Sequence, residues 1–210
     1  GPTRQLCESL AALPDPPPVL VCASAIGIYG DRGDEILEES SPPGTDFLAE
    51  VAVQWEAACQ PAVDAGIRVV HVRFGIVLDP NGGALKKMIL PAKLFGGALG
   101  SGRQWWSWIA LQDSVSAMIH TINDESISGP VNFVAPETIR NRDFAKTLGK
   151  VLGRPAIFPA PAFVLRAAMG EMADALLLSS TRVQPTKLTA ARYEYQYVDL
   201  ESYLKSELAG

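Results

Sequence analysis

The chain has few of the residues on which metal sites and disulfide frameworks depend. It contains two histidines and three cysteines among 210 residues. Cys7, Cys22 and Cys59 are odd in number and show no C-x-x-C spacing, so a zinc site or a fully paired disulfide framework is not expected. We predict no metal site, and free thiols kept in a reducing compartment.

Long apolar runs and an excess of basic residues are also absent. No run of 18 apolar residues occurs, and no basic-then-apolar leader opens the chain, so we predict no membrane span. The net charge of −5 argues against nucleic-acid partners. We expect a cytoplasmic protein, or one of an organelle stroma or matrix if a transit peptide preceded the first residue. Gly1 and Pro2 resemble a remnant of tag removal.

A usable phosphate-binding glycine loop is missing as well. The glycines within Gly27–Gly33 have G-x-x-G-x-x-G spacing and follow an expected strand, but the next segment, Asp34–Ser41, is short, acidic and ends at Pro42. A dinucleotide loop should open a long helix whose N-terminus holds the pyrophosphate. Gly97–Gly102 precedes a strand instead. We therefore reject both as phosphate loops.

What is present is an alternation of strands and helices. Continuous apolar runs predict buried strands at Val19–Ala23, Ile67–Leu78, Gln104–Ile109 and Pro130–Val134. Helical spacing predicts helices at 3–13, 84–95, 111–123 and 141–152. A further helix is expected to begin at a cap on Thr45 or Asp46 and to end at Gly66. A Pro-punctuated helical stretch is expected at 161–178, and a last helix begins at Asp199. This order is typical of a doubly wound α/β sheet. A Gly-rich loop is expected at 96–102.

Four segments carry a family resemblance: ASAIGIYGDRGDE, DFLAEVAVQWEAA, VRFGIVLDPNGGAL and GSGRQWWSWIALQD. Together with the tail, including PTKLTAARYEYQY, they resemble the atypical extended short-chain dehydrogenase/reductase relatives called nucleoside-diphosphate-sugar epimerase-like. The resemblance implies a chain truncated at its N-terminus. It also implies a partial Rossmann-like parallel sheet without its first strands and glycine loop, and a smaller C-terminal α/β substrate lobe. We expect residues 3–80 and 104–135 in the cofactor-binding domain, and 81–103 and 136–210 in the substrate lobe.

The same resemblance assigns cofactor contacts at the ends of two strands. Ser24 corresponds to the family serine that faces the nicotinamide, and the expected cofactor-binding residues are Ala23, Ser24, Ala25, Arg73, Gly75, Ile76 and Val77. Strand carboxyl ends are where ligands bind in such sheets. The alternatives are an ordinary loop-capping hydroxyl for Ser24, a plain strand end for Gly75–Val77, and a carboxylate ion pair for Arg73.

The acid/base pair of ordinary members is absent. They use Tyr-x-x-x-Lys, in which the lysine lowers the tyrosine pKa. None of the five tyrosines has a lysine four residues later, and alignment on Trp55-Glu56 places Leu48 and Ala52 at the two positions. Tyr29 and Asp113 join Ser24 as candidate catalytic residues. A packed loop aromatic and a helix-turn carboxylate are the alternatives, while Glu56 is expected on a solvated face and His71 in the core.

Two functions follow as hypotheses. The first is a fragment of an NAD(P)-dependent sugar-nucleotide epimerase or reductase, expected to use NADP at full length, with weak or absent affinity in this chain. The second is a non-catalytic, nucleotide-responsive binding protein linked to cell or organelle division. A small molecule such as a nucleotide sugar is the expected partner, and the exposed sheet edge predicts self-association. Trp105, Trp106 and Trp108 either wall a substrate cleft or pack the small lobe.

Overall fold

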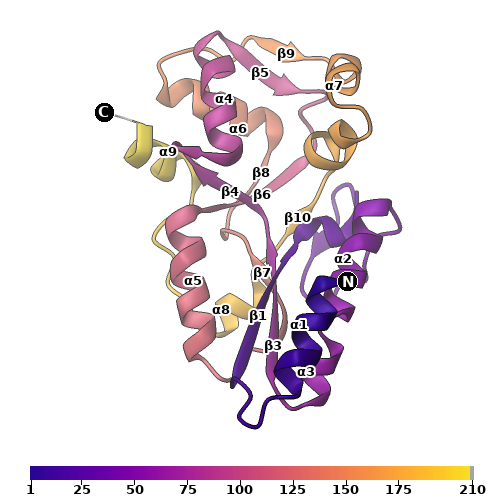
Figure 1. Cartoon of the computed structure of the whole chain (residues 1–210). Coiled ribbons are helices and arrows are strands. Elements are labelled where there is room, and N and C mark those ends of the chain that lie inside the picture. The colour runs from indigo at the N-terminus through magenta and orange to yellow at the C-terminus, as the bar shows by residue number, and fades with distance from the viewer. Residues whose placement is uncertain (209–210) are drawn as a thin grey trace.

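The computed structural model describes residues 1–208 and has two lobes (Figure 1). The larger one, the sheet lobe, is built on three parallel strands in the order β1 (Val19–Ala25), β3 (Arg68–Phe74) and β7 (Gly129–Phe133). The expected α/β fold with a parallel, Rossmann-like sheet is confirmed. β1 lies at the edge of this sheet in the described part of the chain.

Helices cover both faces of the sheet (Figure 1). On one side lie α1 (Pro2–Ala11), α2 (Phe47–Ala57) and α3 (Gln60–Asp64), and on the other α5 (Leu111–Asn123) and α8 (Thr186–Ala190). Asp46 caps α2, because its carboxylate accepts the Ala49 backbone N–H at 3.0 Å. The sheet lobe also contains the one-turn helix η1 (Ile26–Tyr29) and the parallel pair β2 (Ile36–Leu37) and β10 (Arg182–Val183).

The small lobe surrounds a separate apolar core. Its strands are β4 (Ile76–Asp79), β6 (Trp105–Ala110) and β8 (Thr138–Arg140) in one sheet, and β5 (Gly96–Leu99) and β9 (Phe158–Ala160) in another. Its helices are α4 (Gly83–Lys93), α6 (Asn141–Val151), α7 (Ala162–Met169), η2 (Asp174–Leu178) and α9 (Leu200–Leu208). Trp106 and Trp108 are buried in this core with Phe144 and Tyr203. Trp105 lies on the opposite strand face, and the guanidinium groups of Arg140 and Arg182 lie over its ring, 4.2 and 4.4 Å from the ring centroid.

Three expected boundaries differ from the structure. The single strand Ile67–Leu78 is interrupted at Gly75, after which the chain enters a second sheet as β4. The helix expected to reach Gly66 ends at Ala57, and a new turn begins near Pro61, because proline cannot continue the first helix. The first part of the loop expected at 96–102 forms β5 (Gly96–Leu99), and the turn is confined to residues 100–102.

The stripe of Phe47, Val51 and Trp55 on α2 does not face the apolar core. These side chains are 75%, 38% and 56% exposed, whereas Ala49 and Ala52 are buried. The small alanines let α2 approach η1 and β1 closely, so the large side chains point away from the sheet.

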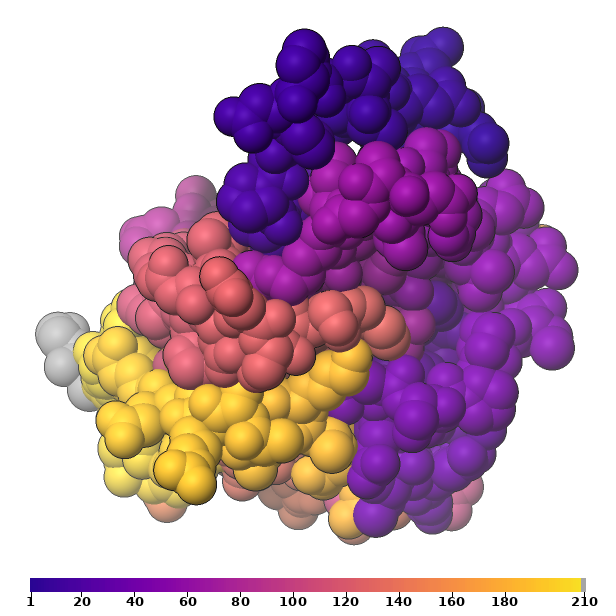
Figure 2. Space-filling model, turned by 90° about the horizontal axis from the view of Figure 1, so that it is seen from below, coloured from indigo at the N-terminus to yellow at the C-terminus, as the bar shows by residue number. Residues whose placement is uncertain are grey.

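The C-terminal segment returns to the sheet lobe. Figure 2 shows residues coloured yellow lying directly beside the salmon-coloured α5, and α8 packs on β7. The segment 182–190, which the sequence assigned to the substrate lobe, therefore lies against the sheet. Conversely, β4 and β6, which the sequence assigned to the cofactor-binding domain, form the sheet of the small lobe. No helix within residues 1–208 combines the length and apolarity needed to cross a membrane.

Candidate cofactor and substrate cleft

A cleft of about 1170 Å³ lies between the two lobes. Its floor includes Ala25 at the end of β1, and Phe74 and Gly75 at the end of β3. Trp106 and Gln104 of the small lobe line it as well. The cleft is therefore at the carboxyl edge of the parallel strands, where ligands bind in open α/β sheets.

The residues expected to contact a cofactor divide into two groups. Ala25, Gly75 and Ile76 line the cleft, whereas Ala23, Ser24, Arg73 and Val77 are not among its lining residues. Successive strand residues point to opposite faces, so a contiguous set of strand residues cannot all reach one ligand. Gly75 has a packing role as well, because a Cβ there would lie 2.6 Å from the Ser107 carbonyl oxygen.

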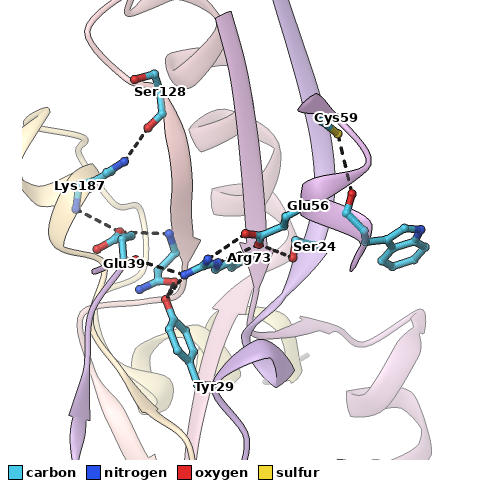
Figure 3. A network of polar contacts seen from close by, with 10 residues as sticks. Ser24, Tyr29, Glu39, Glu56, Cys59, Arg73, Ser128 and Lys187 are labelled. Atoms are coloured by element: carbon cyan, nitrogen blue, oxygen red, sulfur yellow. Dashed lines mark hydrogen bonds and ion pairs between the residues drawn. The ribbon is translucent and has the colours of Figure 1, made fainter. Parts of the chain in front are cut away.

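Ser24 and Arg73 meet on Glu56 of α2 instead (Figure 3). The Ser24 hydroxyl donates to Glu56 Oε1 at 2.8 Å. Arg73 donates from Nε to Oε1 and from Nη2 to Oε2, both at 2.9 Å, which makes a bidentate ion pair. The carboxylate alternative for Arg73 is thus confirmed. The prediction of a solvated Glu56 is wrong, since its side chain is only 13% exposed.

The surroundings of Glu56 keep it ionised. Burial raises the pKa of its carboxyl, but the hydrogen bonds from Arg73 and Ser24 and the charge of Arg73 outweigh burial and hold the pKa below its usual value. Ser24 therefore donates to a carboxylate at neutral pH. Glu56 orients Ser24 and is a poor proton donor.

Tyr29 belongs to the same network and does not reach the cleft. Its hydroxyl donates to Asn132 Oδ1 at 2.7 Å and accepts from Arg73 Nη1 at 2.9 Å, and its ring is fully buried. Burial raises the pKa of the phenol, with Arg73 opposing it. The packed-aromatic alternative describes this geometry, and Tyr29 cannot hydrogen-bond a substrate without breaking it.

The Asp113 carboxylate is also buried, and its hydrogen-bond partners belong to the C-terminal segment. It is 1% exposed, in the first turn of α5, and accepts the backbone N–H groups of Gln196 at 2.8 Å and Tyr197 at 3.0 Å. The Tyr193 hydroxyl also donates to it. These three bonds join the C-terminal segment to the first turn of α5, which is the structural role that the sequence offered as the alternative for Asp113.

The glycines between residues 27 and 33 do not form a phosphate loop. Gly27 lies within η1, Gly30 ends it, and the chain then leads to β2, so no long helix begins at these glycines. The Asp46 carboxylate lies against Gly30, only 2.7 Å from where a Cβ would stand. This loop is instead the support for the α2 cap.

The comparisons with known proteins agree on one group. The chain is 41% identical over 179 residues to the epimerase family protein Mb2239 of Mycobacterium bovis, covering 85% of this chain and 60% of that protein. It is 38% identical to the epimerase family protein YfhF of Bacillus subtilis, covering 99% of this chain and 68% of YfhF. The crystal structure of human epimerase family protein SDR39U1 (isoform 2) with NADPH superposes with a TM-score of 0.93 at 33% identity, covering 100% of this chain and 71% of that one. The chain belongs to the epimerase family.

A second match concerns the end of this epimerase-family chain. Residues 160–207 match a domain of unknown function, DUF1731. This match includes α7, η2, α8 and α9, and so spans both lobes. The chain spans 60% of the length of the M. bovis relative.

Sequence reasoning missed most of the lining residues. On α2, the cleft is lined by Leu48 and Ala52, the positions to which the resemblance assigns Tyr-x-x-x-Lys, and by the exposed stripe of Phe47, Val51 and Trp55. That stripe at helical spacing was the available signal. It marked a surface that lines the cleft and does not face the core.

Proposed function

We propose that this epimerase-family chain supplies the nicotinamide-facing and substrate-facing parts of an NAD(P)-dependent, epimerase-like oxidoreductase. The observation that carries the proposal is the cleft at the carboxyl ends of β1 and β3, with Ala25 and Gly75 on its floor. The NADPH in the crystal structure of the human relative supports a nicotinamide dinucleotide as the cofactor.

The described residues suit the nicotinamide half of such a cofactor but not its pyrophosphate. Ala25, Gly75 and Ile76 offer a flat, uncharged strand edge that suits a nicotinamide ring. Within residues 1–208, no glycine turn opens a helix toward the cleft, and the carboxylates of Asp31 and Asp46 line it. Like charges oppose a pyrophosphate there. When bound, the nicotinamide would supply or accept a hydride.

The role we propose for Ser24 is positional. Its proton is committed to Glu56, which Arg73 keeps ionised, so this unit fixes β1 against α2 beside Ala25. We do not assign proton transfer to Tyr29 or Asp113, because both are buried and fully engaged.

A second candidate function has its own supporting observation. Leu48 and Ala52 line the cleft where a proton-transferring pair would stand, so α2 presents no acid or base there. This favours a protein that binds nucleotide and responds to it without turnover. A link to cell or organelle division would be one use of such binding.

Titration with reduced nicotinamide mononucleotide tests the proposal. We expect saturable binding that Ala25→Leu abolishes by placing a larger side chain on the cleft floor. Ala23→Leu, on the same strand but outside the cleft lining, is the matched control and should bind normally. Equal binding by both variants would contradict the proposal. NADPH consumption with a panel of aldehydes and ketones then separates the two functions, since turnover excludes the binding-only candidate.

A further inference from the structure

Large apolar side chains from both lobes face the same cleft. Phe47, Val51 and Trp55 line it from α2, and Met172 and Leu176 line it from the α7–η2 region. Met172 and Leu176 are 47% and 50% exposed, so this wall, like that of α2, is open to solvent. Neither α7 nor η2 contains a fully buried residue. Exposed apolar surfaces of this kind, gathered around a concavity, mark a binding site.

The charges at the cleft have one dominant sign. Four carboxylates line it, from Asp31, Asp46, Glu171 and Asp174, and among the described lining residues the one cationic side chain is Arg166. Arg166 donates to Asp174 from Nε at 2.9 Å and from Nη2 at 2.7 Å. One edge of its guanidinium is therefore paired with a bidentate carboxylate.

The N-terminus of α2, which could otherwise bind an anion, is capped by Asp46. A helix N-terminus can hold phosphate through its free backbone N–H groups. At the start of α2, the Asp46 carboxylate accepts the Ala49 N–H and adds a negative charge. A diphosphate in this cleft would meet three carboxylates not paired with a cation, and the one guanidinium among the described lining residues already pairs with Asp174.

We infer that the substrate is a neutral, largely apolar small molecule with a carbonyl or hydroxyl group, and that it is not a nucleoside-diphosphate sugar. This inference rests on the proposed function, because it assigns the substrate to the same cleft. The apolar part of the molecule lies between α2 and the α7–η2 region, and the reacting group lies over Gly75. Burial of apolar surface on both walls supplies the affinity.

Two ligand series test the inference on the 210-residue chain. Methyl n-alkyl ketones of increasing length should bind with affinity that rises about fourfold per added methylene, as expected for apolar burial. UDP and UDP-glucose should show no saturable binding at low ionic strength. Tighter binding of UDP-glucose than of the longest soluble ketone would overturn the inference.

Substitutions inside and outside the cleft test where the ketones bind. Trp55→Ala should weaken ketone binding about tenfold by removing one wall. Val63→Ala, an exposed apolar residue on α3 outside the cleft lining, is the matched control and should have no effect. Equal losses in both variants, or none in either, would contradict the assignment.

A third variant tests the charge argument. Asp174→Asn releases Arg166 and should create measurable UDP binding, and the absence of any gain would contradict the role given to the ion pair. These outcomes are distinct from those of the nicotinamide titration. Ketone binding without nicotinamide binding would support the apolar substrate class and contradict the proposed oxidoreductase function. Nicotinamide binding without ketone binding would contradict the substrate class alone.

Discussion

Three neighbouring strands each place one polar side chain at the same level of the sheet. Ser24 on β1 is opposite Arg73 on β3, which is opposite Asn132 on β7. Glu56 and Tyr29 then close the row by hydrogen bonds from the covering elements (Figure 3). A buried polar row stabilises a fold only while every member keeps its partners, so single substitutions here should be costly.

Arg73→Met tests this row directly. It leaves the largely buried Glu56 carboxylate without its cation, so we expect a loss of about 3–5 kcal/mol in the free energy of unfolding, measured in urea. Adding Glu56→Leu should recover part of the loss, because the uncompensated charge disappears. A double variant that is less stable than Arg73→Met alone would contradict the account.

His71 predicts a pH dependence of stability. Burial lowers the pKa of its imidazole below the ordinary value of 6.5, and its Nδ1 is buried without a hydrogen-bond partner. The unfolded chain therefore takes up a proton more readily than the folded one, and stability falls as the pH drops below about 6.5. The sequence predicts a satisfied core histidine, whereas no protein group hydrogen-bonds that nitrogen.

Melting temperatures of His71→Gln measured across mildly acidic pH check this. The variant should lose the part of the acid destabilisation that arises near the ordinary histidine pKa, whereas His120→Gln should retain it. An unchanged pH profile in His71→Gln would rule out this residue as the source.

At the scale of elements, the sequence predicts what depends on neighbours along the chain. The helix at Leu111–Asn123 forms with the expected bounds, because its apolar spacing is complete within the segment. The break at Gly75 could not be predicted, since it depends on the close approach of Ser107, far along the chain. Glu56 was missed for the same reason, as its partner Arg73 is on another element.

Gly75→Ala tests whether the interruption of the strand at residue 75 requires a glycine. The added methyl would lie 2.6 Å from the Ser107 carbonyl oxygen and 2.8 Å from Val134 Cγ1, so we expect a loss of about 1–3 kcal/mol. Gly27→Ala also changes a cleft glycine but meets nothing within 4 Å, and should stay within about 0.5 kcal/mol of the wild type. Equal stabilities in chemical denaturation would contradict the packing argument.

The edge of β1 predicts association. Its outer backbone groups have no neighbouring strand among residues 1–208, and unpaired edges template further pairing. We expect concentration-dependent self-association in sedimentation, reduced by Ala23→Lys, which adds a charge at an exposed position of the edge strand. A monomer at high concentration would show that the edge is protected.

At the scale of the whole molecule, the site exists only because two lobes meet. Its floor comes from the ends of β1 and β3, one wall from α2, and the other from residues more than a hundred positions away in the α7–η2 region. The sequence could indicate the floor, through the resemblance and the rule on strand ends. It could not indicate the wall from the α7–η2 region, because a local sequence pattern does not determine which surface a helix distant in the chain will face.

Saturation-transfer NMR with NADPH in excess tests the central claim most directly, because it reports which end of a weakly bound ligand touches the protein. The account predicts weak binding in which the nicotinamide protons receive strong saturation and the adenine protons receive little. Low-micromolar affinity, or saturation centred on the adenine, would contradict the claim that this chain presents the nicotinamide-facing half of the cofactor site.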